Sequence, residues 1–342
     1  MFDWLALGHF ISVIGCFSSV SAEMVLVFLT YFIKREFGNF KYLLMSFAIV
    51  GAIFAIFEMM ITPMLHSHNA GYMFFTVVKP FWASKDFMTL MLAIYAGFYA
   101  MTISVLAIQF IYRYWAVFNQ HNLRFFKGPR SIVWFLYASF FGVAWAIGFY
   151  YLAAPDEYSE EYLRPAMLNY YKRNISDVAK LSVVVYKTDE NEKLSIRWKN
   201  SIFILHMSFI MLTQYIIMIY CGLKMYYGMN EKICQESTSS IRLHKQIFRV
   251  LVLQISLPTF FLFAPVTLVI YLPFLNLTLS LPTGIWMCGF NLYPAVDAVI
   301  VMYIITDYRK MFRNLAHLIC RRFTNYTENT SQSISTRINP IA

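Results

Sequence analysis

The chain has 342 residues, of which 59% are hydrophobic and only 13% charged, and its formal net charge at pH 7 is +10. A soluble fold of this composition would leave apolar surface that its few polar side chains could not cover, so lipid is the expected solvent. The basic residues are spread over separate short segments between apolar stretches. This distribution excludes a continuous nucleic-acid-binding surface.

Seven apolar stretches are long enough to span a bilayer, which takes roughly 20 residues. They predict helices, because the strands of a membrane barrel are shorter and alternate apolar with polar side chains. The expected fold class is therefore all-α, a polytopic membrane protein with a seven-helix bundle. No basic region precedes the first stretch, so we expect a retained helix there and not a cleaved signal peptide. The predicted spans are about 8–33, 42–65, 87–112, 131–153, 200–223, 247–272 and 284–305.

Lysine and arginine fall mainly on one side of this predicted bundle. The segments after the first, third and fifth helices and the C-terminal tail hold 18 of the 28 such residues. Cytoplasmic loops are enriched in them, so we predict an outer N-terminus and a cytoplasmic C-terminus. The outer segment 154–199, with short structured pieces over 175–179 and 181–186, is predicted to cover the outer mouth. The expected units are a receptor domain, 1–310, and a cytoplasmic tail, 311–342.

Sequons and one cysteine are candidate modification sites. Asn174 and Asn276 lie on the predicted outer side, whereas Asn325 and Asn329 lie in the predicted cytoplasmic tail. Chance occurrence explains each sequon as well as glycosylation does. Cys320, which precedes two arginines shortly after the last span, is either a palmitoylation site or an unmodified thiol.

The third predicted helix carries polar residues along one face. At about 100° per residue, their spacing keeps them within a narrow arc. The outer pair, Tyr95 and Tyr99, either lines a ligand site or forms hydrogen bonds between packed helices. Arg113 either extends to lipid headgroups or acts as a switch, held in one helix arrangement and released in another. The face consists of Tyr95, Tyr99, Thr102, Leu106, Gln109 and Arg113.

Prolines predict irregular sixth and seventh helices. In the seventh, Pro294 interrupts the backbone ladder close to the carboxylate of Asp297, and we interpret the two as a hinge. In the sixth, two prolines free carbonyl groups that neighbouring helices must satisfy. A static packing role is the alternative for these prolines. The faces concerned are Gln254, Pro258, Phe261 and Pro265 in the sixth helix and Trp286, Phe290, Tyr293 and Asp297 in the seventh.

Three further polar residues lie inside predicted spans. Glu23 and Glu58 are expected to face the bundle as protonated carboxyls, and their different depths argue against an ion pathway. His206 is either a ligand contact or a histidine bonded between helices. No Walker-type loop, His-Glu-x-x-His or Cys-x-x-Cys occurs, and His66 with His68 does not suffice for a metal site, so we expect no enzyme, cofactor or metal.

Several short motifs occur in order along nearly the whole chain. They are Phe37-Gly-Asn-Phe-Lys-Tyr-Leu-Leu44, Phe110-Ile-Tyr-Arg-Tyr114, Leu253-Gln-Ile-Ser-Leu-Pro258, Tyr293-Pro-Ala-Val-Asp297 and Asp307-Tyr-Arg-Lys310. In this order they resemble nematode seven-transmembrane chemoreceptors of the Str type. The resemblance implies a G-protein-coupled receptor in the plasma membrane, in the cilia of sensory neurons, that responds to odorants, pheromones or other small chemicals.

The same resemblance implies residue roles. Arg113 would be the third-helix arginine at the G-protein interface, and Pro294 with Asp297 the seventh-helix switch. Asp297 is followed by Ala298, where the family often has proline, so the local bend differs.

The expected mechanism joins these observations. A small, mostly apolar ligand would bind between the outer halves of the third, fifth, sixth and seventh helices and shift the sixth. The C-terminal segment of a G-protein α subunit would then dock at the cytoplasmic face, whose charge also suits anionic membrane lipid. A ligand-gated channel or transporter is the alternative class. The expected ligand contacts are Tyr95, Tyr99, His206, Phe261 and Trp286, and the expected coupling residues are Arg113, Tyr114, Lys245, Arg249, Pro258, Pro294 and Asp297.

Overall fold

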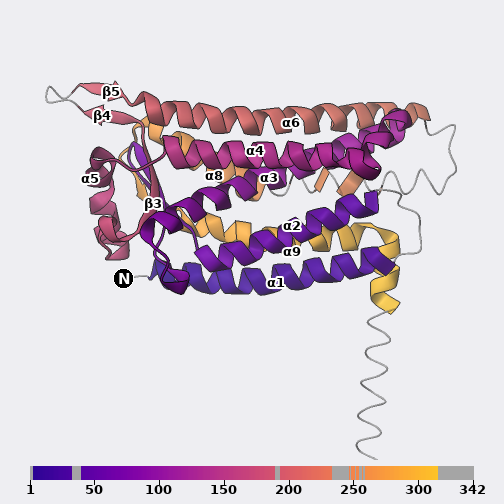
Figure 1. Ribbon diagram of the computed structural model, residues 1–342, viewed down its shortest axis with the longest axis horizontal. Helices are drawn as coiled ribbons and strands as arrows, with labels where there is room; N and C mark the ends of the chain where they lie inside the picture. Colours follow the sequence, from indigo (N-terminus) through magenta and orange to yellow (C-terminus); the bar gives the residue numbers. More distant parts are fainter. Residues whose placement is uncertain are drawn as a thin grey trace, which may run out of the picture.

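Figure 1 shows the computed structural model, which describes residues 3–32, 40–188, 193–232, 246, 248–250, 252–253, 256 and 259–314. Within these ranges five helices are long and apolar enough to cross a membrane, and they run side by side between the two ends of the molecule. The helix α3 is the most buried of them. The five are α1 (Trp4–Phe32), α2 (Phe40–Ile61), α3 (Lys85–Phe118), α4 (Ile132–Leu152) and α6 (Trp198–Lys232).

The sixth and seventh segments complete the bundle. The described part of the sixth includes a π-helical turn, η7 (Thr259–Phe263). It is followed by α8 (Ala264–Tyr271) and by a short 3-10 helix, η8 (Leu272–Leu275). A π-helical turn marks a place where a helix bends, in agreement with the irregular sixth helix that the prolines predict. The seventh is α9 (Gly284–Ile304), after which residues 306–314 are again helical.

A four-stranded antiparallel sheet covers the end of the bundle at which α1 begins. Its strands lie in the order β3 (Ala179–Val184), β2 (Gly71–Thr76), β1 (Met64–His68) and β6 (Ser280–Leu281). We call this the sheet end and the other the opposite end. The sheet joins three loops that are far apart in the sequence, because Tyr72 pairs with Val183 and His68 with Ser280.

The second helix is shorter than predicted because the sheet begins where the prediction still placed helix. The helix α2 ends at Ile61, Thr62 adopts a left-handed conformation with φ of 45°, and Pro63 follows. A left-handed residue followed by proline is a common way to end a helix. Conversely, α3 and α6 continue past their predicted spans toward the opposite end, since polar and aromatic residues lower the hydropathy there without ending the helix.

Alternate residues of the sheet enter two different cores, as the period of a strand requires. Tyr72 and Phe74 pack with the helix bundle. Met73 and Phe75 pack on the other side with α5 (Glu157–Ala166) and η4 (Met167–Tyr171), which belong to the segment predicted to cover the outer mouth. That segment therefore forms a cover of two layers, which we call the lid. The other short elements are η1 (Pro80–Trp82), η2 (Gln120–Phe126), η3 (Gly128–Ser131), η5 (Ile175–Asp177), β4 (Tyr186–Thr188) and β5 (Leu194–Ile196).

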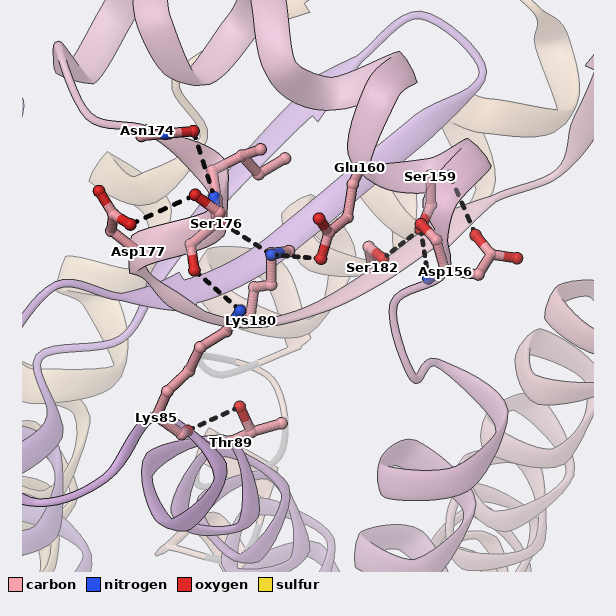
Figure 2. A network of polar contacts seen from close by, with 11 residues as sticks. Lys85, Thr89, Asp156, Ser159, Glu160, Asn174, Ser176, Asp177, Lys180 and Ser182 are labelled. Carbon is pink, nitrogen blue, oxygen red and sulfur yellow. Dashed lines mark hydrogen bonds and ion pairs between the residues drawn. The ribbon is translucent and has the colours of Figure 1, made fainter.

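Polar contacts fix the lid (Figure 2). The buried Lys180 ammonium lies 2.7 Å from Oε1 of Glu160 and donates a hydrogen bond of 2.7 Å to the carbonyl oxygen of Ile175. Burial lowers the pKa of Lys180, and the pairing with Glu160 opposes this effect. The side chain of Asp156 caps α5 through the backbone N–H of Ser159 at 2.9 Å. Strands, helix and loop of the lid are thereby joined by charged and hydroxyl groups with defined partners.

Candidate functional site

A cavity of about 70 Å³ lies between the sheet and the middle of the bundle. Three of its lining residues come from the sheet and three from α3. A water-sized void needs only about 15 Å³, so this space holds several heavy atoms. Among the described residues that line it, none is charged. The residues from these two sources are Leu65, Tyr72 and Phe74 and, on α3, Tyr95, Ala96 and Tyr99.

The remaining walls come from four other helices. Trp145 and Phe149 lie on α4 and are almost fully buried, whereas two methionines of α6 give a flexible wall. An apolar cavity of this size suits a small ligand held mainly by contact with aromatic and aliphatic side chains. The residues from α6, α8 and α9 are Met207, Met211, Ile270 and Phe290.

Tyr95 forms the edge of the cavity toward α2. Its ring stacks on Phe54 at a centroid distance of 5.0 Å and on Phe74 at 6.1 Å. Its hydroxyl lies beside the carboxyl of Glu58, which is 1% exposed. Glu58 therefore faces the bundle, as expected for a carboxyl in the membrane interior.

Tyr99 forms the floor of the cavity. Its ring meets Trp145, Phe263 and Phe290 edge to face, with centroid distances of 5.9, 5.2 and 5.2 Å. Such edge-to-face contacts are among the geometries that aromatic pairs favour. Tyr99 and Phe290 also line a second, smaller cavity of about 20 Å³ beneath this floor. The cluster thus joins the sheet-side cavity to the π-helical turn and to α9.

Residues of α1 and α9 are among those that line the smaller cavity. Glu23 and Pro294 line it, and Glu23 is near enough to the buried carboxyl of Asp297 to interact with it electrostatically. The backbone N–H of Ala295 donates a hydrogen bond of 3.2 Å to the hydroxyl of Ser19. A neighbouring helix therefore supplies the acceptor where Pro294 disturbs the ladder of α9.

Arg113 lies at the opposite end of α3 and is only 6% exposed. Its Cζ is 5.6 Å from the centre of the Tyr112 ring, and it interacts electrostatically with Tyr308 from the helical residues 306–314. The Tyr308 hydroxyl lies 3.0 Å from Oγ1 of Thr30. This position differs from that of an arginine extended to lipid headgroups. It places Arg113 between α1, α3 and the segment that follows α9.

Other predicted coupling residues lie around the same end. Tyr114 packs against Phe118 and against Tyr220 of α6, with centroid distances of 5.6 and 6.1 Å. Nε2 of Gln246, in the sixth segment, donates a hydrogen bond of 2.8 Å to Oγ1 of Thr306. Arg249 is exposed, while Lys245 and Pro258 lie outside the described residues.

The structure brings two of the five predicted ligand residues, Tyr95 and Tyr99, to the cavity. His206 lies instead between helices: its Nε2 is 3.0 Å from the carbonyl oxygen of Ala144, and a Cβ added to Gly148 would come within 2.5 Å of its ring. This is the interhelical arrangement that the sequence left open as the alternative. The side chains of Phe261 and Trp286 lie outside the described residues.

Two pairs of lining residues were not predicted from the sequence. Tyr72 and Phe74 are two positions apart, the spacing of one strand face, but the strand follows an apolar helix and carries no separate signal. Trp145 and Phe149 are four apart on α4, a helix that is apolar on all sides, so periodicity did not distinguish their face.

The two predicted glycosylation sequons lie at the sheet end. Asn174 is exposed, and its side-chain oxygen accepts a hydrogen bond of 3.4 Å from the N–H of Ser176 (Figure 2). Asn276 is also exposed and adopts a left-handed conformation after η8. Both positions are accessible to a modifying enzyme, and glycosylation of them stays a prediction.

A family model described as "Serpentine type 7TM GPCR chemoreceptor Str" matches residues 8–313. Two relatives come from Caenorhabditis elegans: "G-protein coupled receptor str-33" is 37% identical over 278 residues, 81% of each chain, and "Serpentine receptor class r-10" is 30% identical over 334 residues, 96% of this chain and 95% of the relative. The crystal structure of squid rhodopsin matches with a TM-score of 0.57 at 10% identity, covering 93% of this chain and 88% of that one. The last similarity concerns the fold alone.

Proposed function

This chain belongs to the serpentine type 7TM GPCR chemoreceptor family Str, and we propose that it binds a small, mostly apolar chemical and activates a heterotrimeric G protein. The membership confirms the resemblance carried by the sequence motifs. The likeness to rhodopsin confirms the predicted seven-helix membrane bundle. A multi-pass receptor of the G-protein-coupled type follows from these findings, whereas the ligand, the coupling and the residues that carry them are our proposal.

The observation that carries the proposal is the apolar cavity beside Tyr99. Odorants and pheromone-like molecules are small and poor in charge, and this cavity offers contact area without a charged partner. Tyr95 and Tyr99 are the predicted ligand contacts that line it, and we add Trp145, Phe149 and Phe290 to them.

Ligand contact would be coupled to helix movement through the Tyr99 cluster. Phe263 ends the π-helical turn of the sixth segment, and Phe290 precedes Pro294 by one turn of α9. A ligand shifts an equilibrium only by binding one arrangement better than the other. A molecule that fills the cavity would favour a different packing of these rings and so displace the sixth and seventh segments.

At the opposite end the same displacement would release Arg113. Tyr308 and Tyr112 now lie against it, and Gln246 bonds the sixth segment to Thr306. Separation of these groups would expose Arg113, Tyr114 and Arg249 to the C-terminal segment of a G-protein α subunit. Asp297 and Pro294 would supply the hinge in α9.

The proposal places the sheet end outside and the opposite end in the cytoplasm. The distribution of basic residues supports it, as does the position of the predicted sequons at the sheet end. The proposed location is the plasma membrane, in particular the ciliary membrane of sensory neurons.

The test is a screen of volatile and secreted small molecules in cells that express the full chain together with a calcium or cyclic-nucleotide reporter. Ala96→Phe, which fills the cavity, is expected to abolish the response to any molecule found. Leu205→Phe is the matched control, because Leu205 is 67% exposed on the lipid side of α6. An undiminished response of Ala96→Phe at normal surface amounts would show that the ligand binds elsewhere. Ligand-evoked current without a G protein would favour the alternative, a channel or transporter.

A further inference from the structure

The cavity is closed on the side of the sheet. Tyr72 and Phe74 line it with exposures of 2% and 4%, and the residues that follow each of them, Met73 and Phe75, are fully buried in the core on the far side. The helical layer of the lid, α5 with η4, packs on that far side, and the buried pair of Lys180 and Glu160 joins it to β3 (Figure 2). A molecule coming from water above the sheet would have to part both layers.

Two of the lateral seams between helices are also closed. Along α3 and α4, a Cβ on Gly97 would lie 2.6 Å from the carbonyl oxygen of Gly142, so the two backbones touch. Along α4 and α6, Phe149 stacks on Phe203 at 4.9 Å with the rings 8° from parallel, and the Tyr137 hydroxyl donates a hydrogen bond of 2.9 Å to Gln214. Passage through either seam would separate rigid groups.

The seam between α6 and the sixth segment is built differently. Among the described residues it is joined by two hydroxyl pairs, Ser208 with Tyr271 and Tyr215 with Thr259, the second at 3.0 Å. The two α6 positions are seven residues apart, about 10 Å along the helix. Met211 lies between them, and both Met211 and Ile270 line the cavity while keeping partial exposure. Thioether and aliphatic side chains change rotamer readily.

The side chains that line the cavity also indicate which functional group the ligand has. The phenolic hydroxyls of Tyr72 and Tyr99 are buried and have no hydrogen-bond partner among the described residues. A buried donor without an acceptor is unfavourable, and an oxygen on a ligand would relieve it. The cavity therefore fits an apolar molecule with one acceptor oxygen, such as a ketone, ester or ether.

We propose that the ligand is a neutral, lipid-soluble molecule with an acceptor oxygen, and that it enters sideways from the bilayer through the seam bounded by Ser208–Tyr271 and Tyr215–Thr259. This inference rests on the proposed function, because it takes the cavity as the ligand site. Molecules of this kind concentrate in lipid, so the bilayer itself delivers them to the seam.

The experiment uses the purified full chain in phosphatidylcholine vesicles and a photoactivatable probe, a medium-chain alkyl ketone carrying a diazirine. The rate at which Tyr99 and Trp145 become labelled after mixing is followed by mass spectrometry of peptides. The double variant Ser208→Ala/Tyr271→Phe keeps the side-chain bulk but loses the hydroxyl pair. It is expected to speed labelling about fivefold, because losing the free energy of one hydrogen bond changes a rate by about this factor.

Variants of the lid are the contrasting arm. Lys180→Met and the milder Ser182→Ala, which removes the 3.0 Å contact with the Ser159 hydroxyl, are expected to leave the labelling rate unchanged. Phe209→Ala, on the lipid-exposed side of α6, is the matched seam control. A seam variant that labels at the rate of the unmodified protein would overturn the proposed route, and faster labelling of a lid variant would show entry from the water side.

A second arm tests the ligand chemistry. The ketone probe should reach a higher final labelling than the alkane probe of the same length, and Tyr72→Phe/Tyr99→Phe should remove this preference. Equal labelling by the two probes in the unmodified protein would refute the acceptor oxygen. Neither arm measures signalling, so a failure of this inference can be told apart from a failure of the proposed function. The latter would appear as labelling of the cavity without G-protein activation.

Discussion

The two ends of the molecule are held together by different kinds of contact. At the sheet end, strands from three loops, a second core and a buried ion pair give every layer several fixed partners. At the opposite end, the described segments meet through a hydrophobic cluster that includes Leu29, Val250 and Ile305 and through isolated hydrogen bonds such as Thr30 with Tyr308 and Gln246 with Thr306. Many mutually supporting contacts make a rigid element, whereas a few separable ones allow two arrangements. The roles that we propose for the two ends, covering the cavity and coupling to a G protein, therefore place opposite demands on the rigidity of one bundle.

The largest expected effect is at the sheet end. Lys180→Met leaves the partly buried Glu160 without its cation, and we expect the protein to lose about 3 kcal/mol of stability, as when a buried ion pair is broken from one side. Thermal unfolding in detergent measures the loss. The double variant Lys180→Met/Glu160→Gln should recover part of it. Unfolding of Lys180→Met at the temperature of the unmodified protein would mean that the lid is not held by this pair.

A loss of folding stability of similar size is expected at acidic pH. Burial and the neighbouring His68 lower the pKa of His66 to about 4. Between pH 6.5 and 4 the unfolded chain binds the proton and the folded one does not, so stability is complete above pH 6.5 and falls by about 3 kcal/mol as the pH drops to 4. Unfolding measured across this range tests it. His66→Gln, which does not titrate, should lessen the pH dependence, and an identical pH profile would contradict this account.

Gly148→Ala tests the role of His206. The added Cβ would lie 2.5 Å from the imidazole, so we expect a loss of about 1–3 kcal/mol from overpacking. Gly222→Ala in α6 is the control, because an added Cβ there would lie 3.6 Å from the Phe110 ring, an ordinary contact distance. If Gly148→Ala were as stable as the unmodified protein, the contact between α4 and α6 would be looser than described.

The smallest expected effect is at the opposite end. Tyr308→Phe removes the hydroxyl that lies 3.0 Å from Thr30 and is near Arg113. The loss of about 1 kcal/mol should raise ligand-independent nucleotide exchange by roughly fivefold. Tyr303→Phe, whose ring is 70% exposed, is the control. Lower basal exchange in Tyr308→Phe would mean that this contact supports the active arrangement instead.

The sequence predicted what local periodicity and hydropathy determine. Seven spans follow from apolar length, and the interior face of α3 follows from the spacing of Tyr95, Tyr99 and Arg113. The sheet could not be predicted from the sequence, because β2 pairs with β3, more than a hundred residues away. No local pattern specifies such a partner. The lining of the cavity by Trp145 was missed for a related reason: a helix that is apolar all round shows no preferred face.

Position within the bundle distinguishes polar residues that the sequence treats alike. His206 and Tyr99 are both polar residues inside predicted spans. One turns toward the backbone of α4 and the other toward the cavity, which depends on how the helices are rotated against each other. Hydropathy does not specify this rotation, because packing between helices sets it.

We propose that this receptor signals to a G protein through Arg113. Ligand-stimulated nucleotide exchange should therefore be measured in membranes that contain the full chain and a heterotrimeric G protein, with Arg113→Ala compared against Arg313→Ala, an exposed arginine at the same end. We predict that Arg113→Ala lowers the stimulated rate by a factor of roughly 100, as expected for loss of a charge-assisted contact, while Arg313→Ala stays near the unmodified rate. Full stimulation of Arg113→Ala at normal surface amounts would contradict the account.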